Sequence, residues 1–290
     1  MIEFTLSYIE NGISEPSVSG RVYYVSTSGS DGNDGLSASR SFRTISKAAS
    51  IASAGDIVYI RAGNYGSEQV EIRNSGTPGN PIKFIGYKNS PNDISSMYYQ
   101  YAKGRGMNSS EMPYLRSSHG DAKNRGIYIN GKNNIIVKNI QIEGYGRCVY
   151  ATGSVSNVVI ENVLTNGALS NYGNGVGIGI YATPAENKIR VKDCVSINHG
   201  MINFFLIGNN SMIDNCHSYA DATSDAMDYH ISIRGSENIV RRSTGLRSEN
   251  TSHGSHGIGI KSEGIRSEYN LIEDVTMRFS QDHLICFDIT

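Results

Sequence analysis

The sequence has 290 residues, enough for one large domain or two small ones. Its 26 lysines and arginines nearly balance 27 aspartates and glutamates, which argues against a nucleic-acid-binding protein, because such proteins usually carry a strong basic excess. Hydrophobic residues make up 38% of the chain. No apolar run approaches the roughly 20 residues that span a membrane, so we expect no membrane partner.

The composition is typical of a turn-rich β-protein. Glycine occurs 32 times, asparagine is frequent, and short runs of β-branched residues recur along the chain. The first residues, MIEFTLSYIENG, contain neither a basic segment nor a long apolar one, so no signal peptide is visible. Four cysteines lie outside any CxxC or CxxH spacing, which argues against a zinc site.

The N-terminal part predicts a cap and the first strands. Residues 1–20 form an extension, and residues 21–55 predict a strand followed by a capping helix that ends at Gly55. The helix has apolar residues at helical spacing and would cover the edge strands of a β-structure. DIVYIRAGNY and PIKFIGYKN predict the next strands. Residues 89–125 break the pattern and predict one long loop insertion.

From residue 126 onward, one short pattern returns six times. An aliphatic, β-branched residue is followed two positions later by a polar residue, usually Asn or Asp. The aliphatic column holds Val137, Ile160, Val191, Ile213, Val240 and Ile272, and the polar column holds Asn139, Asn162, Asp193, Asn215, Arg242 and Asp274. Asparagine tolerates the left-handed conformation that a sharp bend between two strands requires. A further strand signal precedes each unit, so each repeat contains three short strands.

Three short strands per repeat, stacked in register, predict an all-β fold. We expect a right-handed parallel β-helix, a solenoid with an N-terminal capping helix, in a single domain over residues 1–290. A β-sandwich is the alternative, but it would not keep the aliphatic and polar columns together through consecutive repeats. The chain stops inside a strand, LICFDIT, so the C-terminal end of the helix is expected to be uncapped.

Alternation along the first strand of each coil predicts which side chains face outward. If Ile233 and Ile260 point in, then Arg234 and Lys261 point out and lie on adjacent coils. Two cations this close repel, which favours the neutral form of the lysine, and a neutral lysine is a usable general base. The alternatives are a groove for an anionic substrate and solvated cations that serve solubility.

The loop YADATSDAMD brings three carboxylates together, from Asp221, Asp225 and Asp228. Carboxylates this close repel unless a cation joins them, and oxygen-only ligands suit Ca²⁺. Two readings remain open beside calcium binding. One is a polar loop with unpaired acids, and the other is glycoside hydrolysis with Asp225 and Asp228 as acid and base.

The same region resembles the family 9 polysaccharide lyases, which are pectate-lyase-like β-helices. Members carry a DDGFD-type calcium loop and then a GNGFKLGG-type strand whose lysine is the catalytic base. Here SDAMD (224–228) stands at the first position and HGIGIKSEG (256–264) at the second. The opening YYVSTSGSDGNDG and the stretch AGDIVYIRAGNY resemble the N-terminal cap and first coil of the group. Ser224 departs from the family's first aspartate.

The resemblance implies a polysaccharide lyase that cleaves a uronic-acid polysaccharide by β-elimination. Lys261 would be the base, and Arg234 would bind the substrate carboxylate. The calcium ligands would be Asp225 and Asp228, with Asp221 from the same loop, and the expected substrate-binding side chains are Tyr181, His230, His256 and Arg147. Lys261 also resembles the lysine of the alginate-lyase and chondroitinase group, family 6, but Asp288 stands on the following coil, where that group has an arginine.

A second class of function fits the same fold. A trimeric, tailspike-like β-helix would bind or depolymerise a glycan, and a non-catalytic adhesin would only bind one. We therefore expect a monomer or a homotrimer with an acidic polysaccharide as partner. The expected location is extracellular, or on a virion tail.

Overall fold

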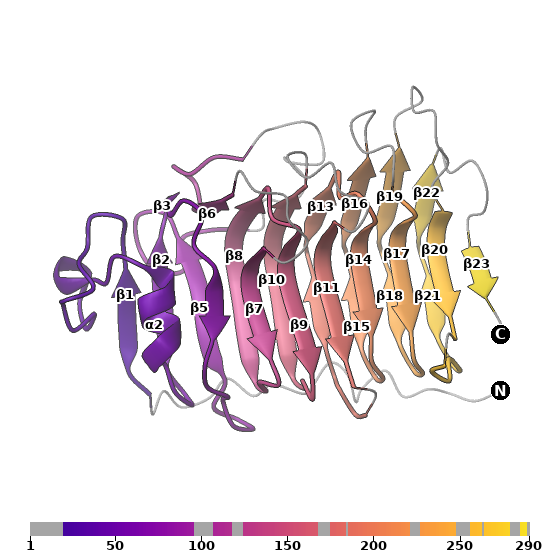
Figure 1. Cartoon of the computed structure of the whole chain (residues 1–290), viewed down its shortest axis with the longest axis horizontal. Coiled ribbons are helices and arrows are strands. Elements are labelled where there is room, and N and C mark those ends of the chain that lie inside the picture. Colours follow the sequence, from indigo (N-terminus) through magenta and orange to yellow (C-terminus); the bar gives the residue numbers. More distant parts are fainter. Residues whose placement is uncertain are drawn as a thin grey trace.

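The structure is a computed structural model that describes residues 20–95, 107–117, 124–167, 175–183, 185–220, 227–247, 256–262, 264–278 and 285–288. Its strands pair in parallel and stack side by side along the longest axis, from β1 at one end to β23 at the other (Figure 1). The stacked coils present three faces. The predicted parallel β-helix is confirmed.

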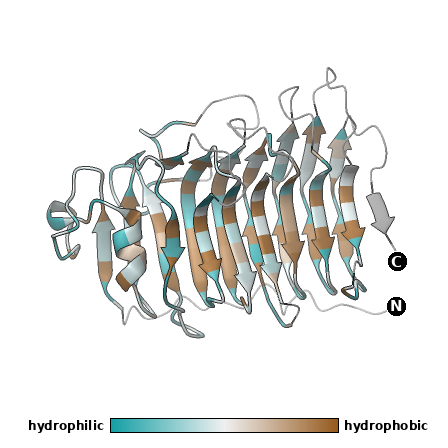
Figure 2. Cartoon of the chain, in the orientation of Figure 1, coloured by the Kyte–Doolittle hydropathy of each residue, from teal (hydrophilic) through white to brown (hydrophobic). Residues whose placement is uncertain are grey.

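The first face is an eight-stranded parallel sheet. In spatial order its strands are β4 (Val70–Ile72), β7 (Arg125–Asn130), β9 (Arg147–Gly153), β11 (Val176–Ala182), β14 (Ile202–Ile207), β17 (Tyr229–Arg234), β20 (His256–Lys261) and β23 (Ile285–Asp288). Along β17, Ile231 and Ile233 are fully buried whereas Arg234 is half-buried, as expected when alternate side chains face the core. Bands of higher and lower hydropathy alternate along these strands (Figure 2).

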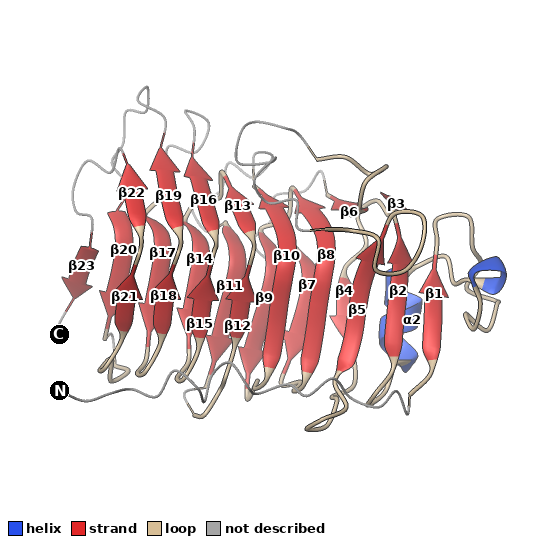
Figure 3. Cartoon of the chain, turned by 180° about the vertical axis from the view of Figure 1, so that it is seen from behind, coloured by secondary structure: helices blue, strands red, loops and turns tan. Residues whose placement is uncertain are grey.

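The second and third faces belong to one 15-stranded sheet that folds at a bend (Figure 3). The second face contains β1 (Val22–Val25), β2 (Ile57–Arg61), β5 (Ile82–Tyr87), β12 (Arg190–Lys192), β15 (Met212–Asp214), β18 (Ile239–Arg241) and β21 (Leu271–Glu273). The third face contains β3 (Gly63–Asn64), β6 (Pro113–Arg116), β13 (Val195–Ile197), β16 (His217–Ala220), β19 (Thr244–Arg247) and β22 (Thr276–Arg278). Two longer strands, β8 (Ile135–Glu143) and β10 (Val158–Asn166), pass through the bend and join both faces.

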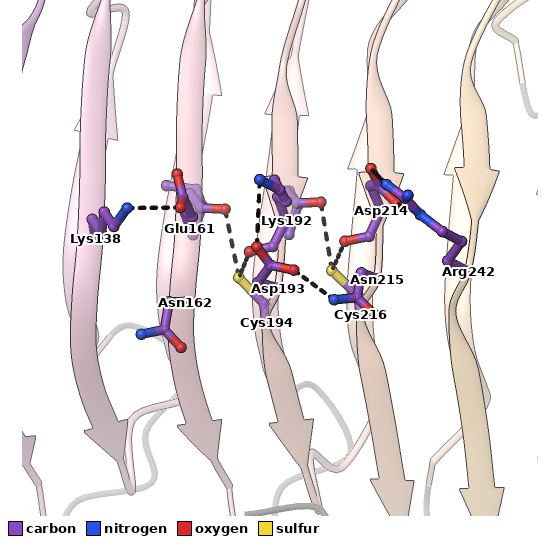
Figure 4. Close-up of polar contacts among 12 residues, drawn as sticks. Lys138, Glu161, Asn162, Lys192, Asp193, Cys194, Asp214, Asn215, Cys216 and Arg242 are labelled. Carbon is purple, nitrogen blue, oxygen red and sulfur yellow. Dashed lines mark hydrogen bonds and ion pairs between the residues drawn. The ribbon is translucent and has the colours of Figure 1, made fainter. Parts of the chain in front are cut away.

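The predicted polar column forms the bend between the second and third faces. All six residues have a positive φ, from 48° to 60°: Asn139, Asn162, Asp193, Asn215, Arg242 and Asp274. Their side chains also form hydrogen bonds from coil to coil. Asn162 Nδ2 donates to Asn139 Oδ1 at 2.7 Å. On the following coils, Asn215 Nδ2 donates to Asp193 Oδ1 at 2.5 Å (Figure 4). The bend thus combines a backbone requirement with a ladder of buried and half-buried amides.

A second left-handed position precedes the second face in each of these coils, and sequence reasoning missed it. It is occupied by Asn134, Asn157, Lys188, Asn210, Glu237 and Tyr269, with φ between 52° and 59°. Asparagines beside it again link the coils: Asn238 Oδ1 accepts from Ser211 N at 3.0 Å, and Asn270 Oδ1 accepts from Asn238 N at 2.9 Å. Because these side chains satisfy backbone groups at each turn, the coils stay in register at two corners.

The aliphatic column and the cysteines fill the interior. Val137, Ile160, Val191, Ile213 and Val240 are almost completely buried. Beside them, Cys194 and Cys216 are buried free thiols on adjacent coils. Burial raises the pKa of Cys216 well above its ordinary value, which makes its thiol unreactive.

The N-terminal helix, α2 (Ile45–Ile51), caps the first coils and is shorter than the predicted segment. Thr44 Oγ1 accepts a hydrogen bond from Lys47 N at 3.1 Å and so fixes its start. Its buried residues, Ile45, Ala48 and Ala49, lie on the side toward β4 and β1. A short 3₁₀ helix, η1 (Ala38–Arg40), precedes it. In the described parts of the chain, no helix has the length and apolar character needed to cross a membrane.

The stretch 89–125, expected to be one long loop, contains the strand β6. It pairs with β3 on one side and β8 on the other, and its Leu115 is fully buried. The buried side chain of Gln141 on β8 donates from Nε2 to Met112 O at 3.1 Å, which holds the residues that precede β6 against β8. The strand was missed because PYLR has only four residues and lies in a stretch rich in Ser, Asn and Gly, which is typical of loops.

Candidate functional site

The outer side of the first face gathers most of the residues that were expected to carry chemistry. Arg234 on β17 and Lys261 on β20 are direct register partners on adjacent coils, as predicted from the alternation. The residues that precede them, Ile233 and Ile260, point into the core and are at most 9% exposed. The two cations therefore lie side by side on the outside, where neighbouring strands are about 4.8 Å apart.

Aromatic rings continue along the same face across four coils. The Tyr128 and Tyr150 rings are stacked, with centroids 5.7 Å apart and planes 10° apart. Tyr150 meets Tyr181 edge-on at 5.1 Å, and Tyr181 meets Phe205 edge-on at 4.7 Å. Burial raises the pKa of Tyr181 above its ordinary value. Its ring is packed between two neighbouring rings, so it acts as part of a row rather than as an isolated sugar-stacking residue.

Two arginines lie on this aromatic row. The Arg125 guanidinium carbon is 4.2 Å from the Tyr128 ring centroid and 5.1 Å from that of Tyr150. The Arg147 guanidinium carbon is 4.4 Å from the Tyr150 centroid and 5.5 Å from that of Tyr181. Stacking on a ring holds a guanidinium plane in place and leaves its N–H edge available to a carboxylate.

The cations at the other end of the face also contact rings. The Arg234 guanidinium carbon is 5.1 Å from the Phe205 ring centroid, and Lys261 Nζ is 5.0 Å from that of Tyr229. Strands β7, β9, β11, β14, β17 and β20 contain no aspartate or glutamate. The outer side of these six strands therefore carries cations and aromatic rings without a carboxylate of its own.

The second face shows how this protein arranges charge where the role is structural. One outward column alternates in sign on successive coils: Lys138, Glu161, Lys192, Asp214, Arg241 and Glu273. Lys138 Nζ lies 2.8 Å from Glu161 Oε1 (Figure 4). Alternation neutralises each charge within the sheet. Strands β7 to β20 of the first face have no such alternation, and Asp288 on β23 is the first acid in register with Lys261. The outer side of these six strands is therefore suited to an anionic ligand.

Asp214 is the most deeply buried member of that alternating column. Burial by itself would raise the pKa of Asp214, but hydrogen bonds from Arg242 and Arg241 outweigh it, and the pKa lies below its ordinary value. Arg242 Nε donates to Asp214 Oδ1 at 2.8 Å, and Arg241 Nη2 donates to Oδ2 at 3.1 Å. This carboxylate is committed to the fold and is not available to a ligand.

His230 was expected to bind substrate, and the structure corrects that expectation. Its side chain is 1% exposed and turns into the coil interior, where Nδ1 lies 2.6 Å from Ser218 Oγ. Burial lowers the pKa of His230 to about 3, with a smaller contribution from Arg247. The strict alternation fails at this corner of the coil, so both His230 and the following Ile231 face inward.

His230 belongs to a buried polar cluster that the sequence did not suggest. Asn203 Nδ2 donates to Ser218 Oγ at 2.7 Å and connects His230 to a second histidine, His199, whose backbone N–H donates to Asn203 Oδ1 at 3.2 Å. His199 Nε2 lies 3.2 Å from Thr165 Oγ1. Burial lowers the pKa of His199 to about 3. Although hydroxyl–imidazole pairs occur in nucleophilic catalysis, these are sealed inside the coils and fix the corner.

The metal-binding prediction falls mainly outside the described residues. This applies to Asp221 and Asp225, and the structure likewise leaves the side chain of His256 undescribed. Asp228 is exposed, and its backbone N–H donates to Met201 O at 2.8 Å. Within the described segments, no three His, Cys, Asp or Glu side chains gather as metal ligands would. Calcium binding by these aspartates stays a prediction.

Known proteins with similar sequences include a family of right-handed β-helices and a curated relative. The profile of a family described as "Pel9A-like, right handed beta helix region" matches residues 23–262. The chain belongs to this Pel9A-like family. The match agrees with the predicted right-handed solenoid. A curated relative, the uncharacterized protein YwoF of Bacillus subtilis (strain 168), is 32% identical over 152 residues, which cover 50% of this chain and 28% of that protein.

Several solved structures are similar to this Pel9A-like chain at low sequence identity. Pectate lyase Pel9A is 14% identical with a TM-score of 0.49, over 96% of this chain and 80% of that one. A rhamnogalacturonan lyase is 17% identical with a TM-score of 0.42, over 93% and 66%. A GH136 lacto-N-biosidase from Eubacterium ramulus is 13% identical with a TM-score of 0.48, over 88% and 57%. Their names describe carbohydrate-active enzymes with different reactions.

Proposed function

We propose that the protein is a polysaccharide lyase that cleaves an acidic, uronic-acid-containing polysaccharide by β-elimination. One observation carries this proposal: Arg234 and Lys261 are register partners within six neighbouring strands, β7, β9, β11, β14, β17 and β20, which contain cations and aromatic rings but no carboxylate. A uronate carboxylate would bind the Arg234 fork through two parallel hydrogen bonds. Lys261, on the next coil, would then lie beside the carbon that bears the acidic proton.

The two side chains would have separate roles in the reaction. Lys261 in its neutral form takes the proton from C5 of the uronate, and the C–H electron pair forms the C4–C5 double bond. The C4–O bond breaks, and the leaving oxygen takes a proton from the lysinium ion or from water. Arg234 stabilises the negative charge that develops on the carboxylate as the proton leaves. The elimination involves no net oxidation or reduction, so it needs no redox partner.

Calcium assistance is a separate part of the proposal. Asp225 and Asp228, with Asp221, would hold the ion, and a bound cation would further neutralise the substrate carboxylate. The described residues supply only the exposed Asp228 toward such a site. The steps assigned to Lys261 and Arg234 do not depend on the ion, so removing it with a chelator tests the calcium prediction by itself.

The test is formation of the unsaturated uronate, followed by its ultraviolet absorbance, on pectate, alginate, rhamnogalacturonan and glycosaminoglycans. Lys261→Ala should reduce turnover by about 10²–10⁴-fold, the usual contribution of a general base. Lys261→Arg keeps a cation but removes the base, and should be as inactive. Lys83→Ala removes a half-buried lysine from the second face and should leave turnover unchanged.

Two results would overturn the proposal. If the Lys261→Ala variant still formed the unsaturated product at the wild-type rate, Lys261 would not be the general base. Release of reducing sugar without any unsaturated product would replace elimination by hydrolysis. A rate that is lost with EDTA and restored by Ca²⁺ would support the calcium site, and an unchanged rate would discard it.

Location and assembly stay proposals of the same kind. An enzyme for an acidic polysaccharide would meet its substrate outside the cell or at a virion tail. Sedimentation analysis distinguishes a monomer from a homotrimer, because the chain mass is 31.5 kDa.

A further inference from the structure

A second pair of cations lies on the first face, well away from Arg234 and Lys261. Arg125 on β7 and Arg147 on β9 are register partners on adjacent coils. From β9 to β17, which carries Arg234, there are three coil steps, or about 14 Å along the axis at about 4.8 Å per step. The two pairs therefore lie on one face but are too far apart to hold the same sugar unit.

The Arg125 and Arg147 side chains are held in place by rings rather than by acids. Tyr128 and Tyr150 stack on each other, and each also has a guanidinium group at 4.2 to 4.4 Å from its centroid. The Nε atoms of both arginines are buried, and no described residue supplies them with a hydrogen-bond acceptor. Among the described residues, neither arginine has an ion pair, in contrast to the arginines of the second and third faces, such as Arg241 and Arg116.

Two like charges on adjacent coils without an acid destabilise the sheet, and this protein avoids such an arrangement along the alternating column of the second face. Its presence here, with both guanidinium groups held against tyrosine rings, points to an anionic ligand that supplies the missing charge. A planar carboxylate matches the guanidinium fork through two parallel hydrogen bonds. A polymer with a carboxylate on successive sugars would place one on each arginine.

We propose that Arg125 and Arg147, held by Tyr128 and Tyr150, form a remote subsite for consecutive uronate carboxylates of an acidic polysaccharide. The polymer then lies along the helix axis, across the strands, from β7 to β20. Those strands are separated by five coil steps, or about 24 Å. This inference rests on the proposed function for the identity of the polymer, but the subsite itself does not require elimination at Lys261.

The test compares binding and turnover in matched variants. Arg125→Ala/Arg147→Ala removes both forks, and Arg125→Lys/Arg147→Lys keeps the charge without the fork. Arg40→Ala/Arg266→Ala removes two exposed arginines elsewhere and matches the change in net charge. Affinities for polygalacturonate and alginate are measured by isothermal titration calorimetry at low temperature, so that cleavage of the polymer during the titration is slow. Dextran sulfate, which is anionic but lacks carboxylates, and uncharged dextran serve as comparison polymers.

We expect the double alanine variant to lose about 10- to 100-fold in affinity for a uronate polymer, and the control pair to lose less than about 2-fold. The double lysine variant should fall between them, which excludes misfolding as the cause. On a short oligouronide that reaches only Arg234 and Lys261, the double alanine variant should keep the wild-type kcat/KM. On the long polymer, the KM of the double alanine variant should rise.

Unchanged affinity in the double alanine variant would overturn the subsite. So would an equal loss for dextran sulfate and for the uronate polymers, since that would show an effect of bulk charge alone. The failure of the proposed function is a different result: the wild-type protein would bind uronate polymers through Arg125 and Arg147 but release no unsaturated product. In that case the subsite stands and the elimination chemistry falls.

Discussion

The bend residue Asn162 allows a quantitative test of what holds the coils in register. Its φ of 49° lies in the left-handed region, which costs an alanine about 1–2 kcal/mol. Its Nδ2 also donates to Asn139 Oδ1 at 2.7 Å, and Asn139 is 1% exposed. Losing that bond leaves a buried acceptor without this donor, at about 1–3 kcal/mol. We therefore expect Asn162→Ala to lower the free energy of unfolding by about 3 kcal/mol.

Two matched substitutions at Asn162 separate the contributions. Asn162→Gly removes the side chain without the conformational penalty, so it should lose about 1 kcal/mol less than the alanine variant. Asn162→Asp keeps the size but presents an acceptor to Asn139 Oδ1, and should lose at least as much as the glycine variant. Urea unfolding followed by circular dichroism measures all three. If the alanine variant stayed within about 0.5 kcal/mol of wild type, the range of neutral surface changes, the explanation of the bend would be refuted.

Two further predictions concern buried charge. Burial lowers the pKa of His199 and His230 from 6.5 to about 3. Between these two pH values the unfolded chain binds protons that the folded chain does not bind. The free energy of unfolding should therefore fall as the pH drops from 6.5 toward 3, by about 1.4 kcal/mol per pH unit for each histidine. Thermal midpoints between pH 7 and pH 4 measure the slope, and His230→Asn should flatten it; an unchanged slope would contradict the burial. Asp214→Asn removes the ion-pair partner of Arg241, whose side chain is only 13% exposed, and should lower the free energy of unfolding by about 3 kcal/mol. Asp34→Asn breaks the exposed pair with Arg40 and should lower it by only about 0–1 kcal/mol. Equal losses in chemical denaturation would show that burial of the Asp214 pair adds nothing.

The repeat made the solenoid predictable from sequence because its two columns report two physical constraints. The aliphatic column is buried, and the polar column has a positive φ even at Arg242, a residue that would not by itself suggest a left-handed bend. Alternation then placed Arg234 beside Lys261 correctly. These successes share a cause: each depends on a regular spacing that every coil repeats.

What escaped prediction depends on places where the spacing breaks. His230 sits at a corner where two consecutive residues face inward, so a period of two assigned it to the wrong side. The stacking of Tyr128 on Tyr150 was also missed, although both occupy one column of the first face. Their separation of 22 residues hides the pairing until the length of the intervening loop is known, and that length varies from coil to coil.

The alternating column on the second face has a consequence for how such a solenoid can grow. Duplication of a single coil would insert a charge beside one of the same sign, for example a second glutamate next to Glu161. Duplication of two coils at once would preserve the order of signs. Electrostatics along this column therefore favours lengthening the solenoid by an even number of coils. The interior packing, with similar aliphatic residues at every level, does not impose this condition.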